Sequence, residues 1–158
     1  MRPESDRSLL VDLARPLVEQ FSPAETELFP LLSEAHFADP RAYGRSGSRR
    51  SDPLGFGLPE VLVLLTPVAL AAMTEVVRYV VERGMRRGQQ VTAVALRRVF
   101  RDEPPAVDAP PIELTSAEWA EVRRIVERVA VRGGVEPARA ALIADAVVGQ
   151  GRLADEPR

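Results

Sequence analysis

The chain has a single histidine, His36, and metal binding is the first chemistry to consider for it. Glu34 and Asp39 lie close by in the sequence, so one imidazole and two carboxylates could approach a cation. Zinc sites in proteins usually take three or four ligands from the chain, and histidine or cysteine dominates them. The chain contains no cysteine, which also removes thiolate nucleophiles and disulfides. We therefore interpret His36 as a surface or helix-end residue and expect no metal site.

Other residues of the kind that perform catalysis occur without the partners they need. Ser46 and Ser48 lie beside glycines, but their segment is typical of a flexible linker and not of a nucleophile turn. The Gly-Phe-Gly at 55–57 lacks the third glycine and the lysine of a phosphate-binding loop. Glu118 and Glu121 could form an acid–base pair, but we expect both to face solvent on an amphipathic helix. The sequence therefore predicts that the protein is not an enzyme and uses no cofactor.

The stretch around which these residues must be arranged is 54–81, the most apolar part of the chain. From Val61 to Thr74 it has no charged residue, and its apolar side chains occupy every face of a helix expected to start near Pro59. A helix that is apolar all round is buried in a protein core or inserted in a membrane. Fourteen uncharged residues are few for a membrane span, which takes about 20 apolar residues. Pro67 predicts a kink in the middle of the helix.

Two further helices are expected before this stretch. The first covers about 5–20, and Pro16 is expected to bend or shorten it. The second begins at Ser22, where an N-cap serine is followed by a proline and by Glu25 in the capping-box position, and Pro30 interrupts it. Each helix has one apolar side, so we expect the two to pair as a hairpin.

The second half of the chain is punctuated by prolines and glycines. Thr115 and Glu118 predict a capping box at the start of a helix that ends at Gly133, and Pro137 opens another helix. No strand pattern of useful length is present, so the sequence predicts an all-α fold. The expected order is an N-terminal helical hairpin (1–38), a flexible basic linker (39–53), a long central apolar helix with a short basic helix (54–101), a Pro-rich acidic linker (102–114), a C-terminal helical hairpin (115–150) and a tail (151–158).

Several segments carry a resemblance to other proteins. They are DPLGFG at 52–57 with the apolar helix after it, and LTSAEW, VRRIV and ARAALIADAVVG in the C-terminal module. Over roughly Asp52 to Gly149, the chain resembles a group of small uncharacterised proteins from high-GC bacteria that share a central hydrophobic helix and a C-terminal helical hairpin. No activity is assigned to that group, so the resemblance implies a fold and no catalytic residues.

Nucleic-acid binding would fall to the C-terminal module, where the spacing from Ala130 to Gly134 loosely matches a helix-turn-helix. The helix that would read the bases, 137–148, offers only Arg139 and Asp145 as charged side chains. A reader of base edges needs more polar reach than this. We therefore rank a nucleic-acid-binding regulator third among the functions considered.

Positive charge is concentrated on both sides of the apolar helix. Residues 41–53 hold four arginines against one aspartate, and residues 82–101 hold six arginines against one glutamate. An anionic lipid surface attracts such clusters by about 1 kcal/mol per residue. The first hypothesis is therefore a non-enzymatic interaction protein whose central helix is inserted in, or lies on, the inner leaflet of the cell membrane. No apolar signal segment follows Met1, so we expect a cytoplasmic location.

In this hypothesis two sets of residues make the contacts. Those expected to touch the membrane or a partner are Leu62, Leu64, Leu65, Val68, Leu70, Met73, Val77, Arg83, Arg86, Arg87, Arg97, Arg98 and Arg101. The C-terminal hairpin is expected to act as a docking module through Trp119, Val122, Val126, Leu142 and Val147.

The second hypothesis is a soluble helical adaptor or regulator with the apolar helix in the core of a bundle. The length of the uncharged run suits a core helix. Covering that helix on every side takes more apolar surface than three short, proline-interrupted helices supply, so this hypothesis requires a homo-oligomer. The partner would then be a protein and not a membrane surface.

Overall fold

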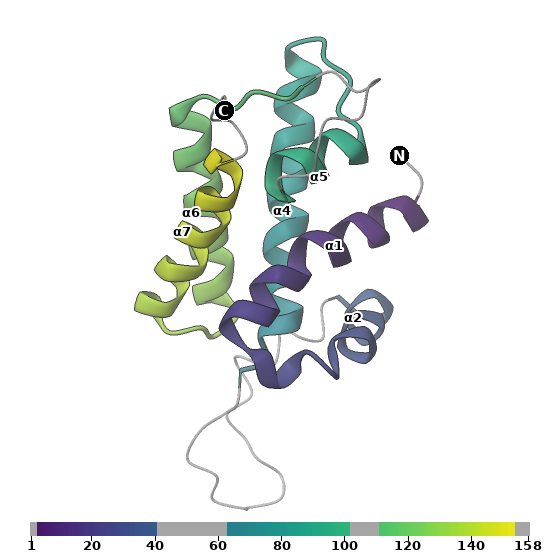
Figure 1. Ribbon diagram of the computed structural model, residues 1–158, viewed down its shortest axis with the longest axis vertical. Coiled ribbons are helices and arrows are strands. Elements are labelled where there is room, and N and C mark those ends of the chain that lie inside the picture. The colour runs from purple at the N-terminus through teal and green to yellow at the C-terminus, as the bar shows by residue number, and fades with distance from the viewer. Residues whose placement is uncertain (1–2, 41–62, 102–110, 154–158) are drawn as a thin grey trace, which may run out of the picture.

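The computed structural model describes residues 3–40, 63–101 and 111–153 (Figure 1). This part of the chain contains six α-helices, one short 3-10 helix and no strand, so the all-α prediction is confirmed. The elements are α1 (Pro3–Phe21), η1 (Pro23–Glu25), α2 (Phe29–Ala38), α4 (Leu65–Arg86), α5 (Ala93–Arg101), α6 (Ser116–Arg132) and α7 (Pro137–Leu153).

The helix that the others surround is α4 (Figure 1). Helices α1, α2 and α6 each pack against it, α7 pairs with α6, and α5 packs against both α1 and α7. Under this cover Leu65, Leu70 and Met73 are at most 1 % exposed and Val68 is 8 % exposed. Burying a side chain of this size stabilises a fold by about 1.5–3 kcal/mol. The apolar helix is therefore the core of the chain.

The chain covers α4 with its own helices, so the expectation that its apolar faces are too few was wrong. Two features supply the surface that was thought to be missing. Helix α1 is 19 residues long and continues through Pro16, and its buried face includes Leu9 and Leu17. Helix α6, expected to belong to a separate docking module, adds Val122 and Val126 to the same core.

Two prolines lie at helix starts and not in helix interiors. Helix α4 begins at Leu65, so Pro67 falls in its first turn, where a backbone N–H has no acceptor within the helix. The expected mid-helix kink at Pro67 was therefore wrong, and the expected start near Pro59 lies outside the described residues. Pro30 likewise opens α2 and does not interrupt a helix that starts earlier. Within the ranges given above, every helix is too short or too polar to cross a membrane.

Replacing Leu70 by alanine tests the burial of α4. We expect Leu70→Ala to lower the free energy of unfolding by about 2–5 kcal/mol, because the substitution removes buried apolar surface and leaves a cavity. The matched control is Leu142→Ala, whose parent side chain is 60 % exposed; it should change stability by less than about 0.5 kcal/mol. Urea denaturation followed by circular dichroism measures both values. Equal losses in the two variants would contradict a buried α4.

Candidate functional site

Glu25 is a buried acid that caps the N-terminus of α4 from 40 residues earlier in the chain. It is 5 % exposed. Its Oε2 accepts the Leu65 N–H at 2.8 Å, and its Oε1 accepts both the N–H and the hydroxyl of Thr66 at 2.9 Å. These N–H groups have no acceptor within the helix, and a negative charge is favourable at this end of the helix dipole. The contact fixes η1 against the start of α4.

The local capping box expected at Ser22 is replaced by this long-range cap. Ser22 makes no side-chain bond to a backbone N–H, and its hydroxyl donates to the Glu25 carboxylate. Burial raises the pKa of Glu25, but the hydrogen bonds from Ser22, Thr66 and Leu65 outweigh burial and hold the pKa below its ordinary value. Glu25 is therefore ionised at neutral pH.

Removing this cap should destabilise the fold. We expect Glu25→Ala to cost about 1–3 kcal/mol, because the N–H groups of Leu65 and Thr66 are then buried without an acceptor. Glu25→Gln keeps a neutral acceptor and should cost less. The matched control, Glu27→Ala, changes an exposed acid two residues later and should have little effect. Thermal and urea unfolding compare the variants, and equal stability of Glu25→Ala and Glu27→Ala would contradict the cap.

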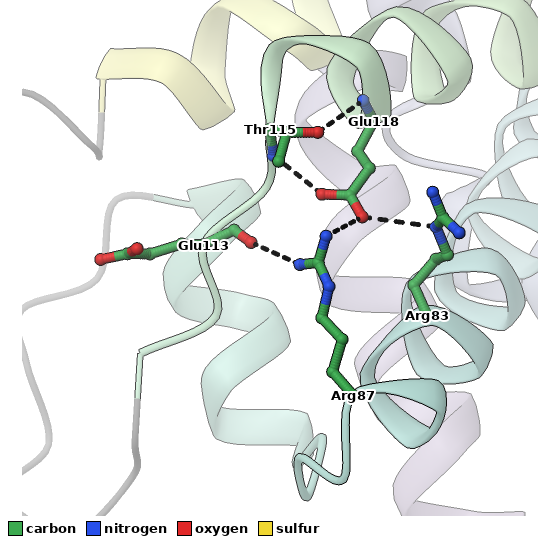
Figure 2. A network of polar contacts seen from close by, with 5 residues as sticks. All are labelled: Arg83, Arg87, Glu113, Thr115 and Glu118. Carbon is green, nitrogen blue, oxygen red and sulfur yellow. Dashed lines mark hydrogen bonds and ion pairs between the residues drawn. The ribbon is translucent and has the colours of Figure 1, made fainter.

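A second buried acid, Glu118, joins the C-terminal end of α4 to the start of α6 (Figure 2). Its Oε2 accepts the Thr115 N–H at 2.8 Å, and the Thr115 hydroxyl accepts the Glu118 N–H at 3.2 Å, so the predicted capping box is confirmed. Its Oε1 accepts a hydrogen bond from Arg87 at 2.6 Å. Arg83 Nε lies 3.3 Å from the same oxygen without hydrogen-bond geometry, so that contact is an ion pair only. Glu118 is 1 % exposed, and the expectation that it faces solvent was wrong because α4 covers it.

The ionisation of Glu118 links the stability of the fold to pH. Burial raises its pKa, but hydrogen bonds from Thr115 and the charge of Arg87 outweigh burial and hold the pKa below the ordinary value of 4.5. A carboxyl whose pKa is lower in the folded than in the unfolded state stabilises the fold above the unfolded pKa. This contribution is lost as the pH falls below 4.5 toward the folded pKa.

The pH dependence gives a direct test of Glu118. We expect Glu118→Gln to lower the free energy of unfolding at neutral pH by about 1–3 kcal/mol, because Arg87 loses its ionised acceptor. The difference from the wild type should narrow as the pH falls through the region where the wild-type carboxylate takes up a proton. Glu121→Gln, which removes a surface ion pair with Arg124, is the control. Urea titrations over a pH series measure the gap, and a gap that does not change with pH would contradict the ionised role.

A groove lies between the N-terminal half of α1 and the C-terminal half of α4, with a volume of about 440 Å³. Leu9 and Val77 are buried at its floor, Leu10 and Val81 are half-buried, and Met85 is 63 % exposed at its rim. Because Glu25 and Glu118 hold the two ends of α4, one wall of the groove is a fixed helix. The remaining lining residues are Asp6, Thr74, Arg78 and Glu82.

Sequence reasoning did not find this groove. Val77 is the single lining residue among the predicted contacts. The apolar faces that carry Leu10 and Val81 are visible in the sequence, but only the packing of α1 on α4 brings them together (Figure 1).

The predicted apolar contacts are mostly occupied by the chain itself. Those buried on α4 are Leu65, Val68, Leu70, Met73 and Val77. Leu64 is half-buried, and Leu62 lies outside the described residues. The C-terminal residues buried against the core are Trp119, Val122, Val126 and Val147. Leu142, at 60 % exposed, is the one member of the docking set that faces solvent.

The predicted basic contacts divide into two groups. Arg83 and Arg87 point to Glu118 (Figure 2), and Arg97 forms an ion pair with Asp12 at 3.0 Å. These three side chains bind helices of the same chain. The second group lies at the surface of α4 and α5: Arg86 and Arg101 are exposed and Arg98 is half-buried.

His36 lies at the end of α2, as expected, but it is buried and not at the surface. Its ring packs edge-on against Phe37 at 5.6 Å, and burial lowers its pKa below the ordinary value. Among the residues that the structure describes, no group of three or more histidine, aspartate or glutamate side chains could hold a metal ion.

Comparison with protein-family models, with curated proteins and with solved structures finds no match for this chain.

Proposed function

We propose that the protein is a non-enzymatic helical adaptor that binds another polypeptide in the groove between α1 and α4. The observation that carries the proposal is the groove itself, which is lined mainly by apolar side chains and has Met85 exposed at its rim. Grooves between helices accept the apolar face of an amphipathic helix. Methionine adapts its shape to the side chain that it meets. The volume of about 440 Å³ is within the range of about 300–1,000 Å³ seen for binding pockets.

This proposal ranks the adaptor above the membrane-associated protein. The membrane hypothesis depended on an uncovered apolar helix and on clustered arginines. In the fold α4 is covered, and Arg83, Arg87 and Arg97 are matched by acids of the same chain. Attachment to an anionic membrane surface through Arg86 and Arg98 is the alternative, and a cytoplasmic location remains a prediction in either case.

The contacts of α7 disfavour the third hypothesis, a nucleic-acid-binding regulator. Arg139 donates to the backbone carbonyl of Phe21, and Asp145 accepts a hydrogen bond from Arg123 at 2.7 Å. The two charged side chains of the would-be recognition helix are therefore engaged within the fold.

Photo-crosslinking at matched exposed positions tests the adaptor proposal. A photoreactive amino acid replaces Met85 in the groove, Leu142 on α7 or Leu31 on α2, whose parent side chains are 63 %, 60 % and 67 % exposed. The full chain is irradiated in a lysate of its native host, and the adducts are identified by mass spectrometry. We expect a discrete protein adduct from position 85 and none from the other two, because of the three positions only 85 lines the groove between α1 and α4.

Other outcomes would contradict the proposal in distinct ways. Equal labelling from all three positions would indicate non-specific contact. A discrete adduct from position 142 alone would move the recognition surface to the C-terminal hairpin. Adducts with lipid in place of protein would support the membrane alternative.

A further inference from the structure

The groove between α1 and α4 carries unmatched negative charge. Of its three charged lining residues, Arg78 is paired with Glu75 at 3.1 Å. Asp6 and Glu82 form no ion pair with any residue in the described ranges, although Arg86 lies one turn from Glu82 on α4. The Oδ1 atom of Asp6 is buried and accepts no hydrogen bond from any residue that the structure describes. The carboxylates of Asp6 and Glu82 give the groove a negative charge, so it favours an occupant that brings a cationic group.

A surface of the opposite charge lies on the outer face of α6. Arg124, Arg128 and Arg132 follow one another at intervals of four residues, which places them on one face of the helix, and all three are exposed. Val131 is 43 % exposed and lines a shallow hollow of about 580 Å³ with these arginines. Glu127 lines the same hollow, and its carboxylate is paired with Arg123 at 2.8 Å. Arg124 is paired with Glu121 at 2.8 Å, whereas Arg128 and Arg132 have no acidic partner within the part of the chain that is described.

These two surfaces are complementary. The groove offers apolar walls with two unpaired acids, and α6 offers an exposed apolar side chain with two unpaired arginines. We infer that α6 of one copy docks in the groove of a second copy, with Val131 entering its apolar part and the two arginines approaching the two acids. Arginine suits this role because a guanidinium donates several hydrogen bonds in a plane that matches a carboxylate. The inference rests on the proposed function of the groove and names its occupant.

Other exposed apolar side chains of the chain fit the groove less well. Leu31 lies one turn from Glu27 and Glu34, two exposed acids without an ion pair to any described residue, so it would bring further acids toward the acids of the groove. Leu142 lies one turn from Arg139 and from Asp145, and both are already bound within the fold, so it brings no free cation. Val94 on α5 has Arg98 one turn away, but Arg98 is half-buried. Arg98 therefore provides the control position.

Charge reversal on the two surfaces tests the pairing. The groove variant carries Asp6→Arg and Glu82→Arg. The stripe variant, named after the row of exposed arginines on α6, carries Arg128→Glu and Arg132→Glu. We expect the wild-type chain to self-associate in sedimentation velocity at high protein concentration, and to do so less at high salt because the paired charges are screened. Each variant alone should remain monomeric. An equimolar mixture should regain self-association, because the reversed groove of one variant then meets the reversed stripe of the other.

The control is Arg98→Glu, which reverses a single charge on α5 and should leave self-association unchanged. A wild-type chain that is monomeric at every concentration, or a mixture that stays monomeric while circular dichroism shows both variants folded, would overturn the inference. Loss of association in Arg98→Glu but not in the stripe variant would overturn it as well, because the contact would then lie on α5. If the groove variant does not fold, Glu82→Arg alone replaces it, since this side chain is exposed.

The failure of this inference is distinguishable from the failure of the proposed function. A monomeric chain that still gives a discrete crosslink from position 85 to a different protein would overturn self-docking and keep the groove as a binding site. A monomeric chain without any such crosslink would overturn both.

Discussion

Covering α4 is the constraint on which the rest of the structure depends. A helix with apolar side chains on every face loses the stabilisation of burial wherever water reaches it. Three helices meet this requirement directly, because α1, α2 and α6 each pack on a different part of α4, and α5 and α7 then pack on those helices (Figure 1). The C-terminal hairpin is therefore part of one core with the N-terminal helices.

Apolar burial has no direction, so it brings helices together without fixing which ends meet. The two buried acids supply that direction. Glu25 bonds to the first N–H groups of α4, and Glu118 bonds to Arg87 near its last turn, each from a segment distant in the sequence. A buried carboxylate is tolerated only when donors surround it, so each contact forms in one arrangement of the helices. This arrangement also places α1 beside α4 and thereby forms the groove.

Local signals in the sequence predicted what lies within one or two helical turns. The all-α class follows from the spacing of apolar residues within each helix, and the capping box joins Thr115 to Glu118 within one turn. The same Glu118 side chain has a second oxygen that binds Arg87, 31 residues earlier, and no local pattern predicts that contact. The cover of α4 was underestimated because proline was counted as a helix breaker, whereas Pro67 lies in a first turn and α1 continues through Pro16. The groove depends entirely on such long-range packing.

Summing charge along the sequence directed attention to the arginines of α4 and α5, several of which the fold pairs with acids, and away from the exposed arginines of α6. The C-terminal module has equal numbers of acids and arginines, so its net charge predicts no charged surface. In the fold Arg123 binds both Glu127 at 2.8 Å and Asp145 at 2.7 Å. One arginine therefore takes two of the acids, and Arg128 and Arg132 are left without acidic partners among the described residues. A neutral segment thus presents a basic face because its ion pairs are distributed unevenly around α6, and it is this residual charge, and not the total, that a second molecule meets.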